Sequence, residues 1–201
     1  MRPVRLAILA SGSGSNAENI ILFFSTENRV KIEIIISNRS EAQVHQRAAR
    51  FGIPSMTFSK ETLTNGPVFT QILKNEGIDF IVLAGYLLKI PPELISAFPN
   101  RIINIHPALL PKFGGKGMYG NHVHQAVVNA REQVTGITIH KVNENYDEGS
   151  IVFQAKCPIN AEDSAEDVAH KVHSLEHKHY PEVISQLLKK EFNVLSSERR
   201  N

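Results

Sequence analysis

A short stretch near the middle of the chain places an amide and an imidazole close together. It reads RIINIHPALLPKF and holds Asn104 and His106 among apolar residues. Because side chains alternate between the two faces of a strand, Asn104 and His106 should project to the same side. An amide donor beside an imidazole suits acyl transfer, in which an oxyanion is stabilised and a proton is moved. The alternative is a structural histidine that hydrogen-bonds to a loop carbonyl.

Pro107 determines where this pair lies in the fold. Proline cannot donate to a sheet ladder, so the strand should end at His106 and place the imidazole at the carboxyl edge of the sheet. Open α/β folds bind their ligands at that edge. The loop that follows, PKFGGKGMYGNH, contains Gly114, Gly115, Gly117 and Gly120, which give it enough freedom to act as a lid over the site.

An acid that orients His106 should come from another segment, and Asp147 is the strongest candidate. It lies in the polar loop NENYDEGS between two apolar runs, with Glu144 and Glu148 beside it. Taken singly, each of these three carboxylates would more often be a solvated turn residue. The sequence contains no serine or cysteine nucleophile with a base at a recognisable spacing, so direct transfer is more economical than a covalent acyl-enzyme.

A glycine-rich loop near the N-terminus, SGSGSNAENI, lies between an apolar run and a helical pattern. Free backbone N–H groups and the positive end of a helix dipole make such a loop an anion site, with a phosphate as the expected ligand. A flexible turn capped by serine or asparagine is the simpler alternative. Gly12, Gly14 and Ala17 also fit the dinucleotide fingerprint. Asn38 and Arg39 stand where NAD binding would need a carboxylate, which disfavours NAD and leaves NADP, bound through Arg39, as an alternative.

The C-terminal stretch HKVHSLEHKH is rich in histidine. His173 and His177 have the i, i+4 spacing of a shared metal site, but an H-E-x-x-H order is missing, and we expect solvated or packing side chains and no metal. The stretch HVHQ, residues 122–125, is likewise expected on the lid or on a helix surface. Glu176 could face the polar end of a ligand.

Runs rich in isoleucine and valine alternate with amphipathic stretches, and this alternation must position the chemistry. It indicates βαβ units and a parallel sheet, hence an α/β fold. The expected strands are VRLAILA, KIEIIIS, DFIVLAG and RIINIH, followed by TGITIHKV and SIVFQAKC as an antiparallel or loosely connected pair. AENIILFFST and EAQVHQRAARFG are expected helices. A long last helix should run from about Ser164 to Lys190, with a kink or break at Pro181, before a frayed tail at 191–201.

Composition sets the class of protein. A chain of 201 residues suits a single domain over 1–201. A formal charge of +2, without a dense basic block, does not indicate a nucleic-acid partner. Cys157 is the only cysteine, so neither an intramolecular disulfide nor a cysteine zinc cluster can form. The apolar run in the first residues is too short for the core of a signal peptide or for a membrane span, so we expect neither there. We therefore expect a cytoplasmic enzyme of small-molecule substrates, monomeric or weakly dimeric.

Four of these stretches together resemble one family. NIHPALLPKF, GITIHKVNENYDEGSIV, SGSGSN and LEHKHYP resemble the phosphoribosylglycinamide formyltransferases of purine synthesis, and the match spans nearly the whole chain. The resemblance implies a Rossmann-like formyltransferase fold with a mostly parallel twisted sheet, an antiparallel C-terminal part and helices on both faces. It also implies 10-formyltetrahydrofolate as the donor and the amine of N1-(5-phospho-D-ribosyl)glycinamide as the acceptor.

The resemblance also assigns roles to residues. It implies a catalytic trio of Asn104, His106 and Asp147, with His140 as a further histidine near the site. The acceptor ribonucleotide would be bound by Gly14, Ser15, Asn16, His173 and Glu176. The folate would be bound by Leu87, Leu88, Lys89, Ile90, Asn104, Asn143, Glu144, Asn145, Tyr146 and Asp147.

The sequence departs from the family at several positions. Where many members carry FMRIL, this chain has YLLKI, so the arginine is replaced by Leu88 and Lys89 follows it. The glycine-rich lid is longer than is common, and Lys141 replaces an apolar or aromatic residue. Related enzymes that formylate methionyl-tRNA or hydrolyse formyl-folate share the Asn-His-Asp set but carry an additional domain, for which this chain has no room.

Overall fold

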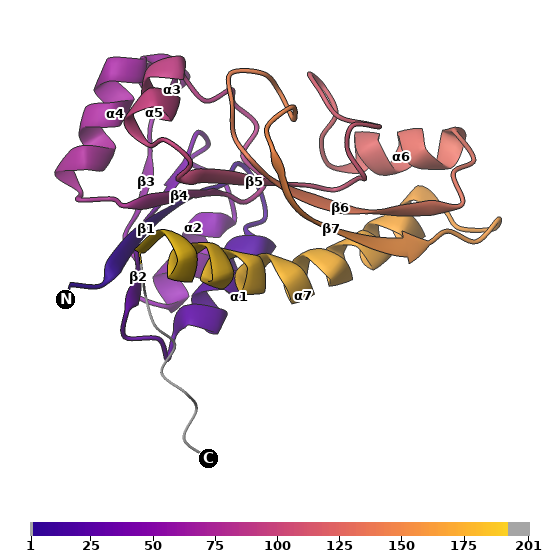
Figure 1. The fold of residues 1–201 in the computed structure, drawn as a ribbon, viewed down its shortest axis with the longest axis horizontal. Helices are drawn as coiled ribbons and strands as arrows, with labels where there is room; N and C mark the ends of the chain where they lie inside the picture. Colours follow the sequence, from indigo (N-terminus) through magenta and orange to yellow (C-terminus); the bar gives the residue numbers. More distant parts are fainter. Residues whose placement is uncertain (1, 193–201) are drawn as a thin grey trace.

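The computed structural model describes residues 2–192, which build one seven-stranded sheet flanked by helices (Figure 1). The strand order is β3-β2-β1-β4-β5-β6-β7. The strands are β1 Val4–Leu9, β2 Val30–Ser37, β3 Ser55–Thr57, β4 Phe80–Leu83, β5 Ile102–His106, β6 Val134–Lys141 and β7 Ile151–Pro158. The helices are α1 Ser15–Phe24, α2 Val44–Arg50, α3 Lys60–Thr64, α4 Gly66–Asn75, α5 Pro92–Ala97, α6 Asn121–Asn129 and α7 Ala165–Phe192.

The strands from β1 to β5 pair in parallel, and β6 and β7 are antiparallel. Helices cover both faces of the parallel part, so a central strand such as β4 is buried throughout and reads as a continuous apolar run. In the antiparallel pair of β5 and β6, Asn104 lies opposite His140. The predicted mostly parallel sheet with an antiparallel C-terminal part is confirmed.

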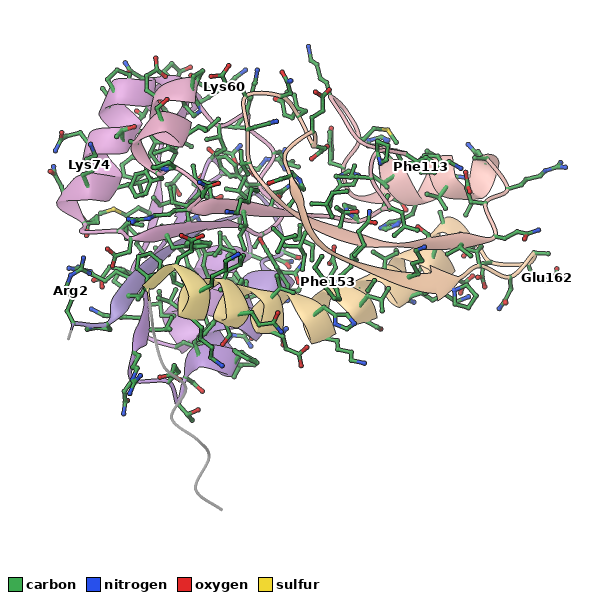
Figure 2. The ribbon with its side chains drawn as sticks, viewed as in Figure 1. Arg2, Lys60, Lys74, Phe113, Phe153 and Glu162 are labelled. Atoms are coloured by element: carbon green, nitrogen blue, oxygen red, sulfur yellow. The ribbon has the colours of Figure 1, made fainter. Side chains whose placement is uncertain are left out.

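Two apolar cores lie on opposite faces of the sheet. On one face, α1, α2 and α7 pack through residues such as Ile20, Val44 and Ile184. On the other, α3, α4 and α5 pack through residues such as Phe69 and Leu94 (Figure 1). The short helix α6 contacts α7 at the β6–β7 end of the sheet. Charged side chains, including Lys60, Lys74 and Glu162, project from the periphery (Figure 2).

The last helix corrects one prediction. We expected a kink or a break at Pro181; the helix continues through this residue over 28 residues, so the break is wrong. Proline inside a helix costs about 3 kcal/mol. Packing offsets this cost, because Tyr180, Val183 and Ile184 are buried against the sheet, and the Tyr180 hydroxyl donates a hydrogen bond of 2.8 Å to the Leu83 carbonyl.

The other differences concern elements with weak sequence signals. The edge strand β3 and the helices α3 to α6 were not among the predicted elements. The tail expected to fray at 191–201 begins with two helical residues, Glu191 and Phe192, and its remainder lies outside the described residues. Within residues 2–192, no helix combines the length and the apolar character needed to cross a membrane.

Candidate active site

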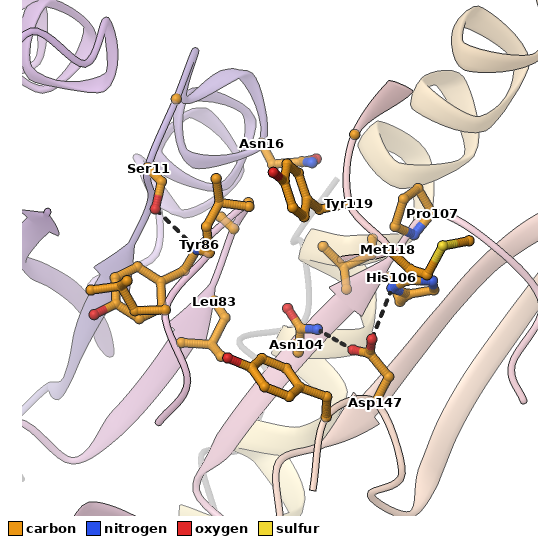
Figure 3. A pocket seen from close by; sticks show the side chains of 18 of the residues that line it. Ser11, Asn16, Leu83, Tyr86, Asn104, His106, Pro107, Met118, Tyr119 and Asp147 are labelled. Carbon is orange, nitrogen blue, oxygen red and sulfur yellow. Dashed lines mark hydrogen bonds and ion pairs between the residues drawn. The ribbon is translucent and has the colours of Figure 1, made fainter. Parts of the chain in front are cut away.

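A cavity of about 870 Å³ opens at the carboxyl ends of the central strands (Figure 3). Its walls come from the loop after β1, the segment after β4, the end of β5, the glycine-rich loop before α6, the loop between β6 and β7, and α7. This is the edge at which open α/β sheets bind ligands, and the volume suits a small-molecule site. Except for Glu144, every residue predicted to bind substrate or catalyse lines this cavity.

Asn104, His106 and Asp147 meet at one side of the cavity, as Figure 3 shows. Asp147 Oδ2 lies 3.5 Å from His106 Nδ1, and Asp147 Oδ1 lies 3.4 Å from the amide nitrogen of Asn104. His106 is 3% exposed and belongs to the strand, whereas Asp147 comes from the loop between β6 and β7. Alternation along the strand thus places Asn104 and His106 where a single carboxylate can contact both.

His140 completes this group from the neighbouring strand. Its Nδ1 is 3.0 Å from the Lys141 carbonyl, which can only accept, so the proton lies on Nδ1. Its Nε2 is 3.2 Å from the Asn104 amide nitrogen and 3.5 Å from Asp147 Oδ1. In this tautomer Nε2 accepts from Asn104, and the contact fixes the orientation of the Asn104 side chain.

The same reasoning fixes one proton of His106. Its Nε2 lies 2.8 Å from the Phe113 carbonyl in the glycine-rich loop, so Nε2–H donates to that oxygen. Burial lowers the pKa of His106, while the Asp147 carboxylate beside Nδ1 opposes this and raises it. The net direction is downward, because burial is the larger effect.

Asp147 is held as a carboxylate by several contacts. Burial would raise its pKa, but the contacts with His106 and with the N–H of Gly115 oppose burial, and the net pKa is lowered. The Gly115 N–H donates to Oδ2 over 2.9 Å. The backbone of Asp147 has φ 57°, in the left-handed region that aspartate tolerates better than most residues. The carboxylate therefore ties the glycine-rich loop to the base of the cavity.

The loop after β1 has the features of an anion site. Within the described part of the chain, none of the backbone N–H groups from Gly12 to Ala17 donates to a protein acceptor. These groups lie at the start of α1, where the helix dipole is positive. Gly14 caps the helix with φ 75°, and a Cβ there would lie 2.5 Å from Val44 Cγ2. Only glycine fits at this position.

The α7 residues predicted near the acceptor reach the same loop. Glu176 Oε2 accepts from the Asn16 amide nitrogen over 2.9 Å and lies 3.2 Å from His173 Nδ1. The His173 and His177 rings stand 4.0 Å apart between centroids. Among residues 2–192, no group of three or more histidine, cysteine, aspartate or glutamate side chains is arranged to hold a metal ion.

The segment after β4 forms the other end of the cavity. Leu87, Leu88, Lys89 and Ile90 line it together with Asn143, Asn145 and Tyr146. The Lys89 ammonium lies 5.9 Å from the centre of the Tyr146 ring, a cation–π arrangement. The Leu87 N–H donates to the Ser11 hydroxyl over 3.0 Å, which joins this segment to the loop after β1. Glu144 is exposed and does not line the cavity, so its predicted folate contact has no support in the geometry.

Sequence reasoning misplaced His124. We expected it on the lid or on a helix surface, but it is 7% exposed, lines the cavity, and has a buried Nδ1 without a partner. Burial lowers its pKa, and Glu176 opposes the change. The pattern VHQAVV, with apolar residues around His124 on a short helix, was the available signal. Tyr86, whose buried hydroxyl has no partner among the described residues, also lines the cavity and was not predicted.

The fold and the site define a class: an open α/β protein with free backbone N–H groups at the start of its first helix and with an amide, an imidazole and a carboxylate in the same cavity. The comparisons agree with this class. Residues 4–184 match the family described as Formyl transferase, and the chain belongs to that family.

Proteins of similar sequence match most of the length of this chain. It is 38% identical to phosphoribosylglycinamide formyltransferase of Bacillus subtilis, over 92% of this chain and 94% of that protein. It is 41% identical to the chloroplastic phosphoribosylglycinamide formyltransferase of Arabidopsis thaliana, over 92% of this chain. The match spans 66% of the length of the Arabidopsis protein and 62% of a second chloroplastic relative, from Vigna unguiculata.

A solved structure supports the same family. The phosphoribosylglycinamide formyltransferase of Bacillus halodurans superposes with a TM-score of 0.84 at 37% identity, covering 94% of this chain and 98% of that one. The predicted Rossmann-like formyltransferase fold is confirmed.

Proposed function

We propose that this protein transfers the formyl group of 10-formyltetrahydrofolate to the amine of N1-(5-phospho-D-ribosyl)glycinamide, in the synthesis of purines. The observation that carries the proposal is the meeting of Asn104, His106 and Asp147 between an anion loop and a largely apolar slot in one cavity. The relatives that share most of the chain bear the name of this activity.

The acceptor occupies the end of the cavity at α1. Its phosphate binds the free N–H groups around Gly14, Ser15 and Asn16. Glu176 and His173, which line the same end, face the sugar. This arrangement directs the glycinamide amine toward the end of β5.

The donor occupies the slot formed by residues 87–90 and the loop between β6 and β7. Apolar side chains such as Leu87 and Ile90 suit the flat pterin ring, and polar groups of Asn143 and Asn145 suit its edge. Lys89 and Tyr146 lie at the rim and replace the arginine that many family members carry one position earlier. Asn104 and His106 then face the formyl carbon.

Transfer proceeds by direct attack. The neutral amine forms a bond to the formyl carbon, and the carbonyl oxygen becomes an oxyanion that accepts hydrogen bonds from the Asn104 amide and the His106 imidazole. The bond from that carbon to N10 of the folate then breaks as N10 takes up the proton that the amine loses. His106 Nε2–H points at the Phe113 carbonyl, so the glycine-rich loop must release this bond before Nε2–H can serve the substrate.

The test is a direct assay of the reaction. The folded protein is mixed with 10-formyltetrahydrofolate and the ribonucleotide, and the deformylated folate is followed by its absorbance. We expect product in proportion to enzyme, and none when either substrate is omitted. The absence of product above background with intact protein would overturn the proposal.

A further inference from the structure

The loop that binds the acceptor phosphate has no positive charge of its own. The backbone N–H groups from Gly12 to Ala17 are neutral, and a helix dipole contributes roughly half an elementary charge. A phosphate monoester carries about −1.5 to −2 charges at pH 7. The loop alone therefore leaves much of the ligand's charge without a cation.

A carboxylate at the same end of the cavity makes this deficit larger. Glu176 lines the cavity and accepts from Asn16, a residue of the loop itself. Its negative charge would repel a phosphate dianion unless a cation stands nearby. Glu18, in the first turn of α1, does not line the cavity, and two arginines compensate its charge.

Most cations near the loop are already engaged. Arg47 forms an ion pair with Glu18 and donates to the Ser13 carbonyl over 2.8 Å. Arg50 lies 2.7 Å from the other Glu18 oxygen. Of the other lysines and arginines that line the cavity, Lys89 lies over Tyr146, and Lys116 belongs to the glycine-rich loop before α6.

Arg39 differs from these residues. It lines the cavity with the loop after β1, and within residues 2–192 no acceptor lies in hydrogen-bonding range of its guanidinium. Its backbone is fixed, because its N–H donates to Ser37 Oγ over 3.2 Å and its carbonyl accepts from His45 Nε2 over 3.1 Å. The preceding Asn38 accepts from the Ser11 hydroxyl over 2.6 Å, which anchors Arg39 beside the loop.

We infer that Arg39 binds the phosphate of the acceptor and supplies the cation that the loop lacks. The inference rests on the proposed function for the identity of the acceptor. A guanidinium presents paired N–H donors that match phosphate oxygens. Arg39, which would bind the 2′-phosphate if the cavity held NADP, is thus assigned to the phosphate of the ribonucleotide.

The test compares Arg39→Ala with the unchanged protein in steady-state assays. We expect the KM of the ribonucleotide to rise roughly ten- to hundredfold, as for loss of a charge-assisted hydrogen bond. The kcat and the KM of the folate should stay unchanged, because Arg39 lies away from the Asn104 side of the cavity. Arg39→Lys keeps the positive charge but lacks the paired N–H donors of the guanidinium, so it should recover part of the affinity for the ribonucleotide. Inhibition by ribose 5-phosphate, competitive with the ribonucleotide, should weaken in parallel.

Arg50→Ala is the matched control, because it removes the same charge from the same side of the molecule without touching the cavity. An unchanged ribonucleotide KM in Arg39→Ala would overturn the inference, as would equal increases in Arg39→Ala and Arg50→Ala, which would show a long-range charge effect. Failure of the proposed function is distinguishable, since the unchanged protein would then form no formylated product at all.

Discussion

Asp147 and His106 come from separate segments and face each other with 3.5 Å between carboxylate Oδ2 and imidazole Nδ1. The other oxygen of the same carboxylate lies 3.5 Å from His140 Nε2 and 3.4 Å from the Asn104 amide nitrogen. One carboxylate thus contacts the side chains of Asn104, His106 and His140. Its charge should fix their orientation, and it opposes the effect of burial on the pKa of His106.

Asp147→Asn keeps the size of this side chain and removes its charge. We expect kcat to fall by roughly 10²- to 10⁴-fold, as when an orienting acid is lost from other acid–base sites. The pKa of His106 should fall further below its usual value, because burial then acts without the opposing carboxylate. Steady-state kinetics and NMR titration of the His106 ring measure these two effects.

The neighbouring acids provide the controls. Glu148 accepts from the Asn145 amide over 2.9 Å at the exposed side of the loop, and Glu144 is exposed and outside the cavity. Glu148→Gln and Glu144→Gln should therefore leave kcat near that of the unchanged protein. A damaging Glu148→Gln beside a near-normal Asp147→Asn would show that the acid is wrongly assigned.

Gly14→Ala tests the cap of α1. The new Cβ would lie 2.5 Å from Val44 Cγ2 on a backbone with φ 75°, so both a clash and left-handed strain oppose it. We expect the free energy of unfolding to fall by roughly 2 kcal/mol or more, measured by urea denaturation. The ribonucleotide KM should rise because the phosphate loop is displaced, while the folate KM should change little.

Gly12→Ala is the matched stability control. A Cβ at Gly12 meets no heavy atom within 4 Å, and its backbone lies outside the left-handed region. Its free energy of unfolding should stay within about 0.5 kcal/mol of the unchanged protein. If both substitutions destabilised the protein equally, the cost would come from the lower conformational entropy of the loop, and not from the clash with Val44 at position 14.

Much of the fold was predictable from local patterns. The strands of the parallel sheet are apolar runs between helical patterns, and period-two alternation correctly put Asn104 and His106 on one side. The reach of Asp147 to His106 was also expected, and its loop follows β6, the strand that pairs with β5. These features depend on short-range sequence signals or on chain connectivity.

The rest depends on packing between distant segments. The apolar pattern around His124 indicates a buried helix face, but the burial of His124 also requires α7 beside α6, a contact between distant segments. The helix continues through Pro181 because Tyr180 and Ile184 gain contacts with the sheet that outweigh the cost of proline. Glu144 is exposed, whereas its neighbours Asn143 and Asn145 line the cavity, and this difference depends on the path of one loop. The family resemblance alone could not distinguish Glu144 from these neighbours.

Tyr180→Phe tests the contact that holds α7 on the sheet. The Tyr180 side chain is fully buried, and its hydroxyl donates 2.8 Å to the Leu83 carbonyl at the end of β4. Removal of the hydroxyl leaves that buried carbonyl without this donor, so we expect a loss of roughly 1 to 2 kcal/mol of unfolding free energy in urea. Tyr119→Phe, at a side chain that is 47% exposed, should change stability little. Equal effects would contradict a specific role for the buried bond.

Stability should depend on pH through the buried histidines. Burial lowers the pKa of His106 and His124 in the folded protein, so the unfolded chain binds their protons more readily. Their stabilising contribution is therefore complete above the pKa of a free imidazole, about 6.5, and is lost as the pH falls toward the lower pKa of the folded state. Urea denaturation from about pH 8 to about pH 5.5 should show decreasing stability.

His124→Gln provides the control for this pH effect. The variant lacks one of the two imidazoles, so its stability should decrease less steeply over the same range. Asp147 acts in a separate window, because its lowered pKa gives stability that is lost only as the pH falls below the unfolded value of about 3.9. Stability that rose between about pH 8 and about pH 5.5 would contradict the assigned directions.

NADPH binding separates the two assignments of Arg39. The loop after β1 fits the dinucleotide fingerprint at Gly12, Gly14 and Ala17, and an NADP site would place the 2′-phosphate against Arg39. In the structure, however, the free N–H groups and the Arg39 guanidinium line the same cavity as Asn104, His106 and Asp147. A single phosphate near the loop would therefore engage both the N–H groups and the guanidinium. We expect calorimetric titration to show no NADPH binding at ordinary cofactor concentrations, and clear binding of the ribonucleotide that weakens in Arg39→Ala. Tight NADPH binding that is lost in the same variant would instead assign Arg39 to a dinucleotide.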